Sequence, residues 1–408
     1  MARFAIIVPP LAGHVNPTLS LGSELLRAGH EVGWISIDTA LQDKLPEGGL
    51  LLLISYQKTE GQKKENEAYL DLISKKNVYG IDSIKFLYEE VLVPLNRYMY
   101  EGINDWLEDF APDLVIADHQ VFAGAIAATQ KNIPYATSVT APAAIKVMNE
   151  LPKVHEWEQN QIIALQQELG IPGRECLDCS ALLTLVFTSK TFFGDMELPG
   201  QFKFIGPVIH NRPAQASFDW QRFHQATGRP KILVSIGTTF DHTHKQAFFD
   251  KVIEALAQEE VTVILVSDPA LLGRIPDNFI VQQQVPQLAL LPHIQAVVCH
   301  GGNNTVCEAL SFGLPLVVIP IAYDQSHMAG RVVRIGAGLR LNFNRFKATH
   351  LREAVQEILQ NETYAEAARH IQASFKEAGG AQQAVRMLEE QLVSKSMIEE
   401  TIHDVSMI

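Results

Sequence analysis

Residues Gln284 to Gln325 read QVPQLALLPHIQAVVCHGGNNTVCEALSFGLPLVVIPIAYDQ, and their pattern is the clearest guide to the fold. Two short apolar runs, Ala296 to Cys299 and Pro315 to Ile319, each end in a loop rich in glycine or polar residues. A helical pattern starts between them, just after the paired glycines. Short buried strands that alternate with helices are typical of a parallel sheet with crossover helices. The stretch therefore predicts an α/β fold.

The same alternation extends toward the N-terminus. We expect a helix from Pro17 to Ala28, because proline suits the first helical turn, and another over FAGAIAATQ. The predicted strands are Phe4 to Val8, Glu31 to Ile37, Leu114 to Ala117, Tyr135 to Val139, Lys231 to Ile236, Thr262 to Val266 and Phe279 to Gln282.

The chain of 408 residues is long enough for two or three domains at roughly 150 residues each. Residues 211–230 have no sustained apolar period, which predicts a linker. We therefore expect an N-terminal domain over 1–210, a second domain over 231–385, and a C-terminal helix or tail over 386–408 that can pack back on the first domain. A cleft between two similar halves is the expected place for chemistry.

Composition excludes several functional classes. Lys plus Arg number 33 and Asp plus Glu number 46, so the net charge of −13 disfavours nucleic acid, whose binding needs clustered cations. No run approaches the roughly 18 apolar residues of a membrane helix, and the N-terminus does not look like a signal peptide. We expect a cytoplasmic protein, which could still touch a membrane through an apolar face.

Cys176 and Cys179 form a CxxC, a spacing found in zinc and redox sites. A structural zinc ion needs four ligands, and no second CxxC or nearby histidine pair supplies the remainder. We expect ordinary reduced thiols and no metal.

Two loops of the second half carry groups that suit an anion. Ser235-Ile-Gly-Thr-Thr239 follows a predicted strand, and Gly237 lets the backbone approach a ligand closely. HGGNNTVCEAL, from His300 to Leu310, opens a helix whose N–H groups and dipole favour negative charge. Glu308 lies one turn after Asn304, within reach of a sugar hydroxyl. The alternative is that Asn304 and Thr305 simply cap the helix.

A third loop holds Asp324 and Gln325 directly after a buried strand. This pair suits several hydroxyls of a sugar, although an aspartate that caps the next helix is an equal alternative.

In the first half, His14 lies in PPLAGHVNP, a loop that joins a strand to a helix. Ligands of α/β proteins bind at such strand ends, and histidine suits general-base work. Asp118 ends the strand LVIAD and could lie beside His14, fixing its tautomer. The neighbouring His119 is expected to be an exposed loop residue.

Common phosphate-binding fingerprints do not occur in the sequence. It has no GxGxxG and no GxxxxGK[ST], and no Asp-x-Asp pair to hold Mg²⁺ against a diphosphate. An anion would then be neutralised by helix ends and N–H groups.

Taken together, these residues resemble the UDP-glycosyltransferases, which have the GT-B fold of two facing Rossmann-like domains with parallel sheets and a cleft between them. The resemblance covers essentially the whole chain and is strongest from Gln284 to Gln325. KILVSIGT, HGGNNT and YDQ look most like the bacterial branch that includes zeaxanthin and macrolide glycosyltransferases.

The resemblance implies a role for each matching residue. His14 matches the catalytic base and Asp118 the acid that supports it. The remaining positions match contacts with the nucleotide sugar, and they are Ser235, Gly237 and Thr238 near the diphosphate, Val285 and Gln287 at the uracil, His300, Gly302, Asn304 and Thr305 at the diphosphate, Glu308 at the ribose, and Asp324 and Gln325 at the transferred sugar.

The resemblance also implies the reaction. A sugar, glucose by resemblance, would pass from a UDP-sugar to a hydroxyl of a hydrophobic acceptor with inversion and without a metal or other cofactor. The apolar stretches VYGIDSIKFLYEEVLVPL and TAPAAIKVM suit a xanthophyll, a polyketide or macrolide, or a phenol. Gln284 stands where many members of the family stack a tryptophan on the uracil. The choice between UDP and TDP as the donor nucleotide therefore stays open. The rival readings are a nucleotide-sugar epimerase of the same fold and a non-catalytic nucleotide-binding homologue.

Overall fold

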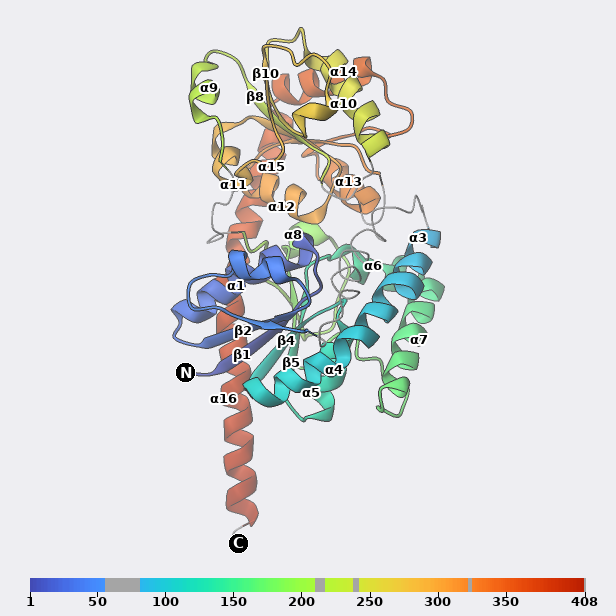
Figure 1. The fold of residues 1–408 in the computed structure, drawn as a ribbon, viewed down its shortest axis with the longest axis vertical. Coiled ribbons are helices and arrows are strands. Elements are labelled where there is room, and N and C mark those ends of the chain that lie inside the picture. The colour runs from blue at the N-terminus through green and yellow to red at the C-terminus, as the bar shows by residue number, and fades with distance from the viewer. Residues whose placement is uncertain (56–80, 210–216, 238–241, 322–324, 407–408) are drawn as a thin grey trace.

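The computed structural model describes residues 1–55, 81–209, 217–237, 242–321 and 325–406. It contains two parallel sheets, one in each half of the chain (Figure 1). The first sheet has the order β3-β2-β1-β4-β5-β6-β7. Its strands are β1 (Arg3–Ile7), β2 (Glu31–Ser36), β3 (Leu50–Leu53), β4 (Leu114–Asp118), β5 (Tyr135–Val139), β6 (Thr184–Val186) and β7 (Phe202–Phe204).

The second sheet has the order β10-β9-β8-β11-β12-β13. Its strands are β8 (Lys231–Ser235), β9 (Thr262–Val266), β10 (Phe279–Gln282), β11 (Ala296–Cys299), β12 (Leu316–Val318) and β13 (Gly338–Arg340). All neighbouring strands within both sheets run parallel. The predicted α/β architecture with two parallel sheets is confirmed.

Helices cover both faces of each sheet (Figure 1). Those of the first half are α1 (Ala12–Arg27), α3 (Ile81–Phe86), α4 (Val93–Phe110), α5 (Phe122–Gln130), α6 (Ala143–Glu150), α7 (Pro152–Glu168) and α8 (Lys190–Phe193), with the short turns η1 (Thr39–Lys44) and η2 (Leu87–Leu92). Those that follow are α9 (Trp220–Gln225), α10 (His242–Leu256), α11 (Gln287–Leu290), α12 (Asn303–Ser311), α13 (Gln325–Arg334), α14 (Ala348–Gln360), α15 (Thr363–Glu377) and α16 (Gly380–Ser406), with η3 (Pro269–Leu271) and η4 (Leu291–His293).

Strand side chains alternate between two cores, one on each face of the sheet. In β1, Phe4 and Ile6 join the cluster beneath α1 and α16, whereas Ala5 and Ile7 join the cluster beneath α4 and α5. Because both faces are buried, these strands appear in the sequence as continuous apolar runs. This is why the central strands were predictable within one or two residues.

One local prediction was wrong, and one segment carries more regular structure than expected. Helix α1 begins at Ala12, so Pro17 lies inside the helix rather than in its first turn. The predicted linker also carries α9, whose Phe223 is buried in the core of the second half. The described part of the linker is therefore partly packed against that half.

Helix α16 returns to the first half and runs along it (Figure 1). Ala384, Val385 and Leu388 lie in the same buried cluster as Phe4 and Ile6. No helix in the described ranges has the length and apolarity needed to cross a bilayer.

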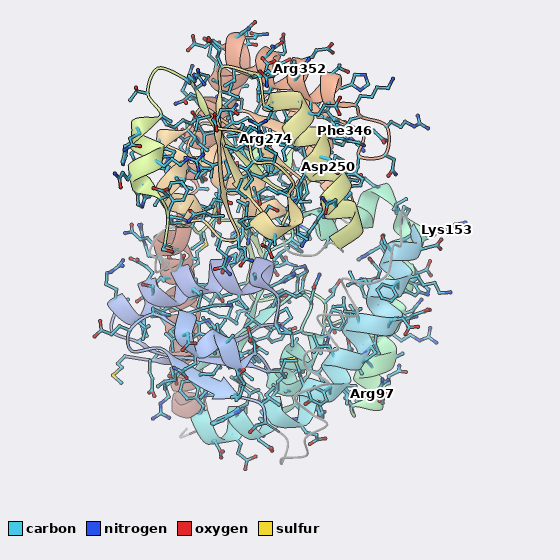
Figure 2. All side chains as sticks on the ribbon, turned by 45° about the horizontal axis from the view of Figure 1, so that its top comes forward. Arg97, Lys153, Asp250, Arg274, Phe346 and Arg352 are labelled. Carbon is cyan, nitrogen blue, oxygen red and sulfur yellow. The ribbon has the colours of Figure 1, made fainter. Side chains whose placement is uncertain are left out.

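Charged side chains join helices at the surface. Arg97 of α4 makes a bidentate hydrogen-bonded contact with the carboxylate of Glu168 on α7, with N···O distances of 2.5 and 2.7 Å. In the second half, Arg352 of α14 donates to the carbonyl of Ala255 on α10 at 3.0 Å. Figure 2 locates both arginines near the outside of the molecule.

Helix α7 carries a buried acidic side chain. Glu158 is 9% exposed. Burial raises the pKa of Glu158 to about 7, and the nearby Asp178 carboxylate adds to the effect. The Nδ1 atom of His155 lies 3.8 Å from the Glu158 carboxylate. Burial also raises the pKa of the Cys176 thiol to about 12, which keeps that thiol protonated.

The folded protein therefore binds a proton at Glu158 that the unfolded chain releases near pH 4.5. We expect the free energy of unfolding to fall by up to about 3 kcal/mol as the pH rises from about 4.5 through 7. Urea unfolding followed by circular dichroism should show this fall in wild type and a much smaller one in Glu158→Gln. The exposed Glu156→Gln on the same helix is the control, and a Glu158→Gln profile parallel to wild type would refute the assignment.

Candidate active site

In both sheets the strand order reverses at one point. The reversal lies between β1 and β4 in the first sheet and between β8 and β11 in the second. Crossover connections diverge from such a point and leave a crevice at the carboxyl ends of the strands. The candidate residues follow these strands, so the sheet topology itself gathers them.

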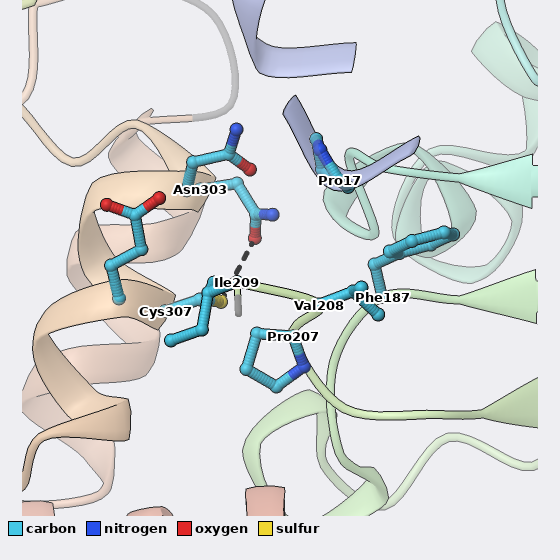
Figure 3. A pocket seen from close by; sticks show the side chains of 9 residues that line it. Pro17, Phe187, Pro207, Val208, Ile209, Asn303 and Cys307 are labelled. Atoms are coloured by element: carbon cyan, nitrogen blue, oxygen red, sulfur yellow. Dashed lines mark hydrogen bonds between the residues drawn. The ribbon is translucent and has the colours of Figure 1, made fainter. Parts of the chain in front are cut away.

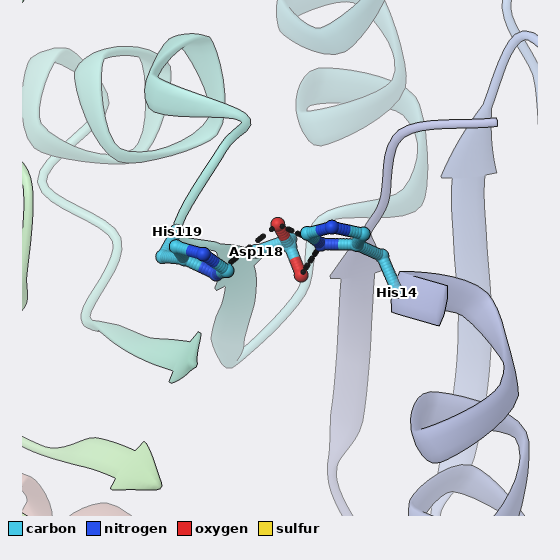
Figure 4. A group of neighbouring side chains, drawn as sticks. All are labelled: His14, Asp118 and His119. Atoms are coloured by element: carbon cyan, nitrogen blue, oxygen red, sulfur yellow. Dashed lines mark hydrogen bonds and ion pairs between the residues drawn. The ribbon is translucent and has the colours of Figure 1, made fainter. Parts of the chain in front are cut away.

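His14 and Asp118 meet at the reversal in the first sheet. His14 lies in the first turn of α1, directly after β1, and Asp118 ends β4. The His14 Nδ1 atom lies 2.9 and 3.0 Å from the two carboxylate oxygens (Figure 4). This contact places the proton on Nδ1 and leaves Nε2 able to accept one.

The Asp118 side chain is 1% exposed, and it keeps its charge because its neighbours outweigh burial. Burial acts to raise the pKa of Asp118, but the charge of His14, then that of His119, and hydrogen bonds from His14 and the Gln120 N–H lower it overall. The Gln120 N–H donates to Oδ1 at 2.9 Å. A buried ionised carboxylate is suited to stabilise an imidazolium beside it.

His119 differs from the prediction of an exposed loop residue. Its side chain is only 9% exposed, and its Nδ1 lies 3.5 Å from the Asp118 carboxylate. The ring stacks on His14 with centroids 5.3 Å apart. Burial lowers the pKa of His119, and the Asp118 charge only partly offsets it. Its Nδ1 also lies 3.3 Å from the Ser138 carbonyl at the end of the neighbouring strand β5.

Thr140, which the sequence reasoning missed, completes the group. It follows β5, the neighbour of β4 in the sheet, and is 2% exposed. Its hydroxyl donates to Asp118 Oδ2 at 3.1 Å and lies 2.8 Å from His14 Nδ1. The sequence signal that could have identified Thr140 is a hydroxyl residue at the carboxyl end of the strand next to β4.

In the second half, His300 is enclosed by two predicted site glycines. The Gly237 backbone has φ of +74°, and a Cβ there would lie 2.8 Å from the His300 ring. A Cβ on Gly302 would lie 2.7 Å from the same ring. Burial lowers the pKa of His300 to about 4, against a smaller opposing effect of its backbone contact with Ser235. The imidazole is therefore neutral at physiological pH.

Helix α12 begins directly after Gly302. Its N-cap is Gly302, so Asn304 and Thr305 lie inside the first turn and do not cap the helix. Glu308, one turn later, is 4% exposed and accepts a 2.6 Å hydrogen bond from Gln287 at the start of α11. The structure thus brings the predicted uracil and ribose residues together, while the half-buried Val285 lies two residues before Gln287.

The last predicted loop is described only in part. Gln325 begins α13, is 4% exposed and accepts from the Ile321 N–H at 2.9 Å. Asp324 and Thr238 lie outside the described residues.

A narrow pocket lies between the two halves (Figure 3). Pro17 and Phe187 contribute from the first half, and Asn303, Cys307 and Glu308 of α12 from the second. Asn303 is a second residue that the sequence reasoning passed over, although it stands within the HGGNNT motif.

The described residues offer one group that could hold a metal ion, made of His14, Asp118 and His119 with ligand atoms within 4.8 Å of one another. Of these three residues, His14 and Asp118 already bond to each other and to Thr140.

Comparison with known proteins places this chain in a family. Residues 250–390 match the Erythromycin biosynthesis protein CIII-like, C-terminal domain. The chain is 30% identical to the NDP-glycosyltransferase YjiC of Bacillus subtilis, over 95% of this chain and 96% of that protein. The chain belongs to the bacterial GT-B glycosyltransferases.

Other relatives agree with this assignment. The zeaxanthin glucosyltransferase of Pantoea ananas is 24% identical, with 96% of both chains covered. The crystal structure of CalG4, the calicheamicin glycosyltransferase, is 25% identical with a TM-score of 0.74, covering 96% of this chain and 98% of that one. The predicted GT-B fold is confirmed, and the protein is a glycosyltransferase. The roles of individual site residues stay predictions.

Gly237 offers a test of the second-half site. In Gly237→Ala, the added methyl group would meet the His300 ring on a backbone with positive φ. We expect a loss of about 1–3 kcal/mol in stability and at least about tenfold weaker UDP binding by calorimetry. Gly273→Ala is the control, because its Cβ meets nothing within 4 Å. Equal UDP affinity in the two variants would refute the prediction that Gly237 belongs to the nucleotide-binding site.

Proposed function

We propose that this glycosyltransferase acts in the cytoplasm and transfers glucose from UDP-glucose to a hydroxyl of a hydrophobic small molecule, with inversion and without a metal ion. The observation that carries the proposal is the His14–Asp118 pair. It lies at the sheet reversal of the first half, and the start of α12 bonds to the residue before His14.

The proposed chemistry depends on Nε2 of His14, the ring nitrogen that does not contact Asp118. As the acceptor oxygen attacks the anomeric carbon, its proton passes to Nε2 of His14. The bond between the anomeric carbon and the diphosphate oxygen breaks, and UDP leaves with the electron pair. Attack from the face opposite the leaving group inverts the anomeric centre. The Asp118 carboxylate, 2.9 Å from Nδ1, stabilises the imidazolium that forms.

The departing diphosphate needs positive potential. The first N–H groups of α12 and its dipole supply such potential without a cation. Because Gly237 has no Cβ, the neutral His300 ring packs directly against its backbone, next to the loop that the proposal assigns to the diphosphate. Fixed dipoles aimed at developing charge can replace a metal ion in this role, which supports metal independence.

The choice of donor and acceptor is supported by the relatives and by the nucleoside end of the site. The relative from Bacillus subtilis is described as an NDP-glycosyltransferase and that from Pantoea ananas as a zeaxanthin glucosyltransferase. Gln287 and Glu308 form a bonded pair that suits a nucleoside, and Gln284 is exposed and offers no ring for stacking. In the apolar stretch before Leu95, Val91 and Leu92 are core residues packed against α5. Fewer of its side chains than expected are therefore free to contact an acceptor.

The base assignment predicts a large kinetic effect. UDP release from UDP-glucose, measured with a panel of hydrophobic alcohols and phenols, should fall about 10²–10⁴-fold in His14→Ala. Asp118→Asn should lower kcat at least about tenfold and leave UDP affinity unchanged. Activity retained in His14→Ala would refute the mechanism, whereas turnover without an acceptor would favour an epimerase or hydrolase.

Metal independence and inversion have their own test. Acceptor-dependent turnover should be unchanged by excess EDTA, because no step requires a cation. Proton NMR of the first product formed from UDP-α-glucose should show the large anomeric coupling of a β-glucoside. EDTA-sensitive turnover that Mg²⁺ restores, or an α-product, would contradict this part of the proposal.

A further inference from the structure

Two adjacent amides at the start of α12 reach across to the first half. The Asn303 side chain donates to the carbonyl of Thr140 at 2.9 Å. The Asn304 side chain donates to the carbonyl of Gly13 at 3.0 Å. Gly13 precedes His14 in the chain, and the Thr140 hydroxyl contacts His14 directly. The helix of the second half is thus bonded on both sides of the His14–Asp118 pair.

The Gly13 carbonyl is available because of Pro17. In a regular helix, the carbonyl of residue 13 accepts from the N–H of residue 17, and proline has none. The carbonyl of the exposed Gly13 is therefore open to a donor from outside its own helix. Asn304 supplies that donor from the other half.

Asn303 is held in the orientation that this contact needs. Its Oδ1 accepts from the Cys307 thiol, one turn along α12, at 3.6 Å (Figure 3). With Oδ1 occupied, Nδ2 faces Thr140 and donates to its carbonyl. Cys307 is 1% exposed, so this support lies in the core.

Thr140 connects Asn303 to the His14–Asp118 pair. Its hydroxyl bonds to Asp118 Oδ2 at 3.1 Å and lies 2.8 Å from His14 Nδ1, while its carbonyl is held by Asn303. The residue is 2% exposed. A displacement of its backbone must therefore move a hydroxyl that touches both members of the pair.

We propose that Thr140 and Asn303 are positioning residues that align the His14–Asp118 pair only while the start of α12 is docked against the first half. This inference rests on the proposed role of His14 as the base. When the halves separate, the Thr140 carbonyl loses its donor and the hydroxyl no longer has a fixed place. The base is then complete only in the closed enzyme, where the donor is enclosed.

The Thr140 hydroxyl is tested with Thr140→Val, which keeps the shape, and Thr140→Ser, which keeps the hydroxyl. We expect Thr140→Val to lower kcat about tenfold with unchanged UDP affinity. The acidic limb of the kcat/KM profile should move to higher pH, because the carboxylate loses a stabilising donor. Thr140→Ser should restore both. A Thr140→Val enzyme with wild-type kcat and pH profile overturns the proposal.

The link to Asn303 is tested by a double-mutant cycle. Asn303→Ala should lower kcat about tenfold and move the acidic limb as Thr140→Val does. Because both changes act through the same hydroxyl, the double variant should be no worse than Thr140→Val alone. Fully additive losses, or a loss in Asn303→Ala confined to donor KM, would overturn the coupling.

Ser374→Ala is the matched control. It removes the 2.8 Å contact between Ser189 and Ser374, another buried hydrogen bond between the halves that lies away from the catalytic pair. Its kcat should stay within about twofold of wild type. A loss equal to that of Asn303→Ala would show that any weakening of the interface suffices, and would overturn the specific role.

His14→Ala in the same assay separates the two proposals. If it keeps wild-type activity, the proposed base is wrong and the positioning role falls with it. If His14→Ala is inactive while Thr140→Val and Asn303→Ala are both normal, the base stands and only the positioning role is overturned.

Discussion

The reversal of strand order in each parallel sheet is the constraint on which the site depends. The crossover connections diverge between β1 and β4 in the first sheet and between β8 and β11 in the second. This divergence leaves a crevice at the carboxyl ends of these strands. His14 and Asp118 follow one pair of strands, and Gly237 and His300 follow the other. The chemistry needs no special loop to gather these groups, because a right-handed parallel sheet already brings its strand ends together.

Backbone groups that helices cannot satisfy are used to join the two halves. Pro17 deprives the Gly13 carbonyl of its helical donor, and the side chain of Asn304 replaces it. At the second contact, the Thr140 carbonyl follows the end of β5 and takes its donor from Asn303. Such contacts are specific, because a hydrogen bond needs a short distance and a favourable angle, and misalignment of the halves removes both. The interface therefore favours one relative position of the halves through groups next to the catalytic pair.

The sequence was most informative where burial on both faces imposes a pattern. The limits of β9, β10 and β11 were predictable because these strands are short apolar runs flanked by polar residues. Pro17 misled the prediction of α1, since the preference of proline for a first turn is only statistical. β13 passed unnoticed because it has three residues and only Gly338 is buried. The link between Asn303 and Thr140 spans 163 positions of sequence, and no local pattern reports such a contact.

Two histidines share one buried carboxylate, and their contacts decide which of them is suited to take a proton. The Nδ1 of His14 lies 2.9 and 3.0 Å from the two oxygens of Asp118, so both carboxylate oxygens are within hydrogen-bond distance of that ring. His119 is 3.5 Å from the carboxylate and directs its Nδ1 to the Ser138 carbonyl at 3.3 Å. Burial lowers the pKa of His119, and a charge on either ring disfavours a charge on its stacked neighbour. The arrangement therefore disfavours a charge on His119, and the His119 ring stacks against the ring of the proposed base.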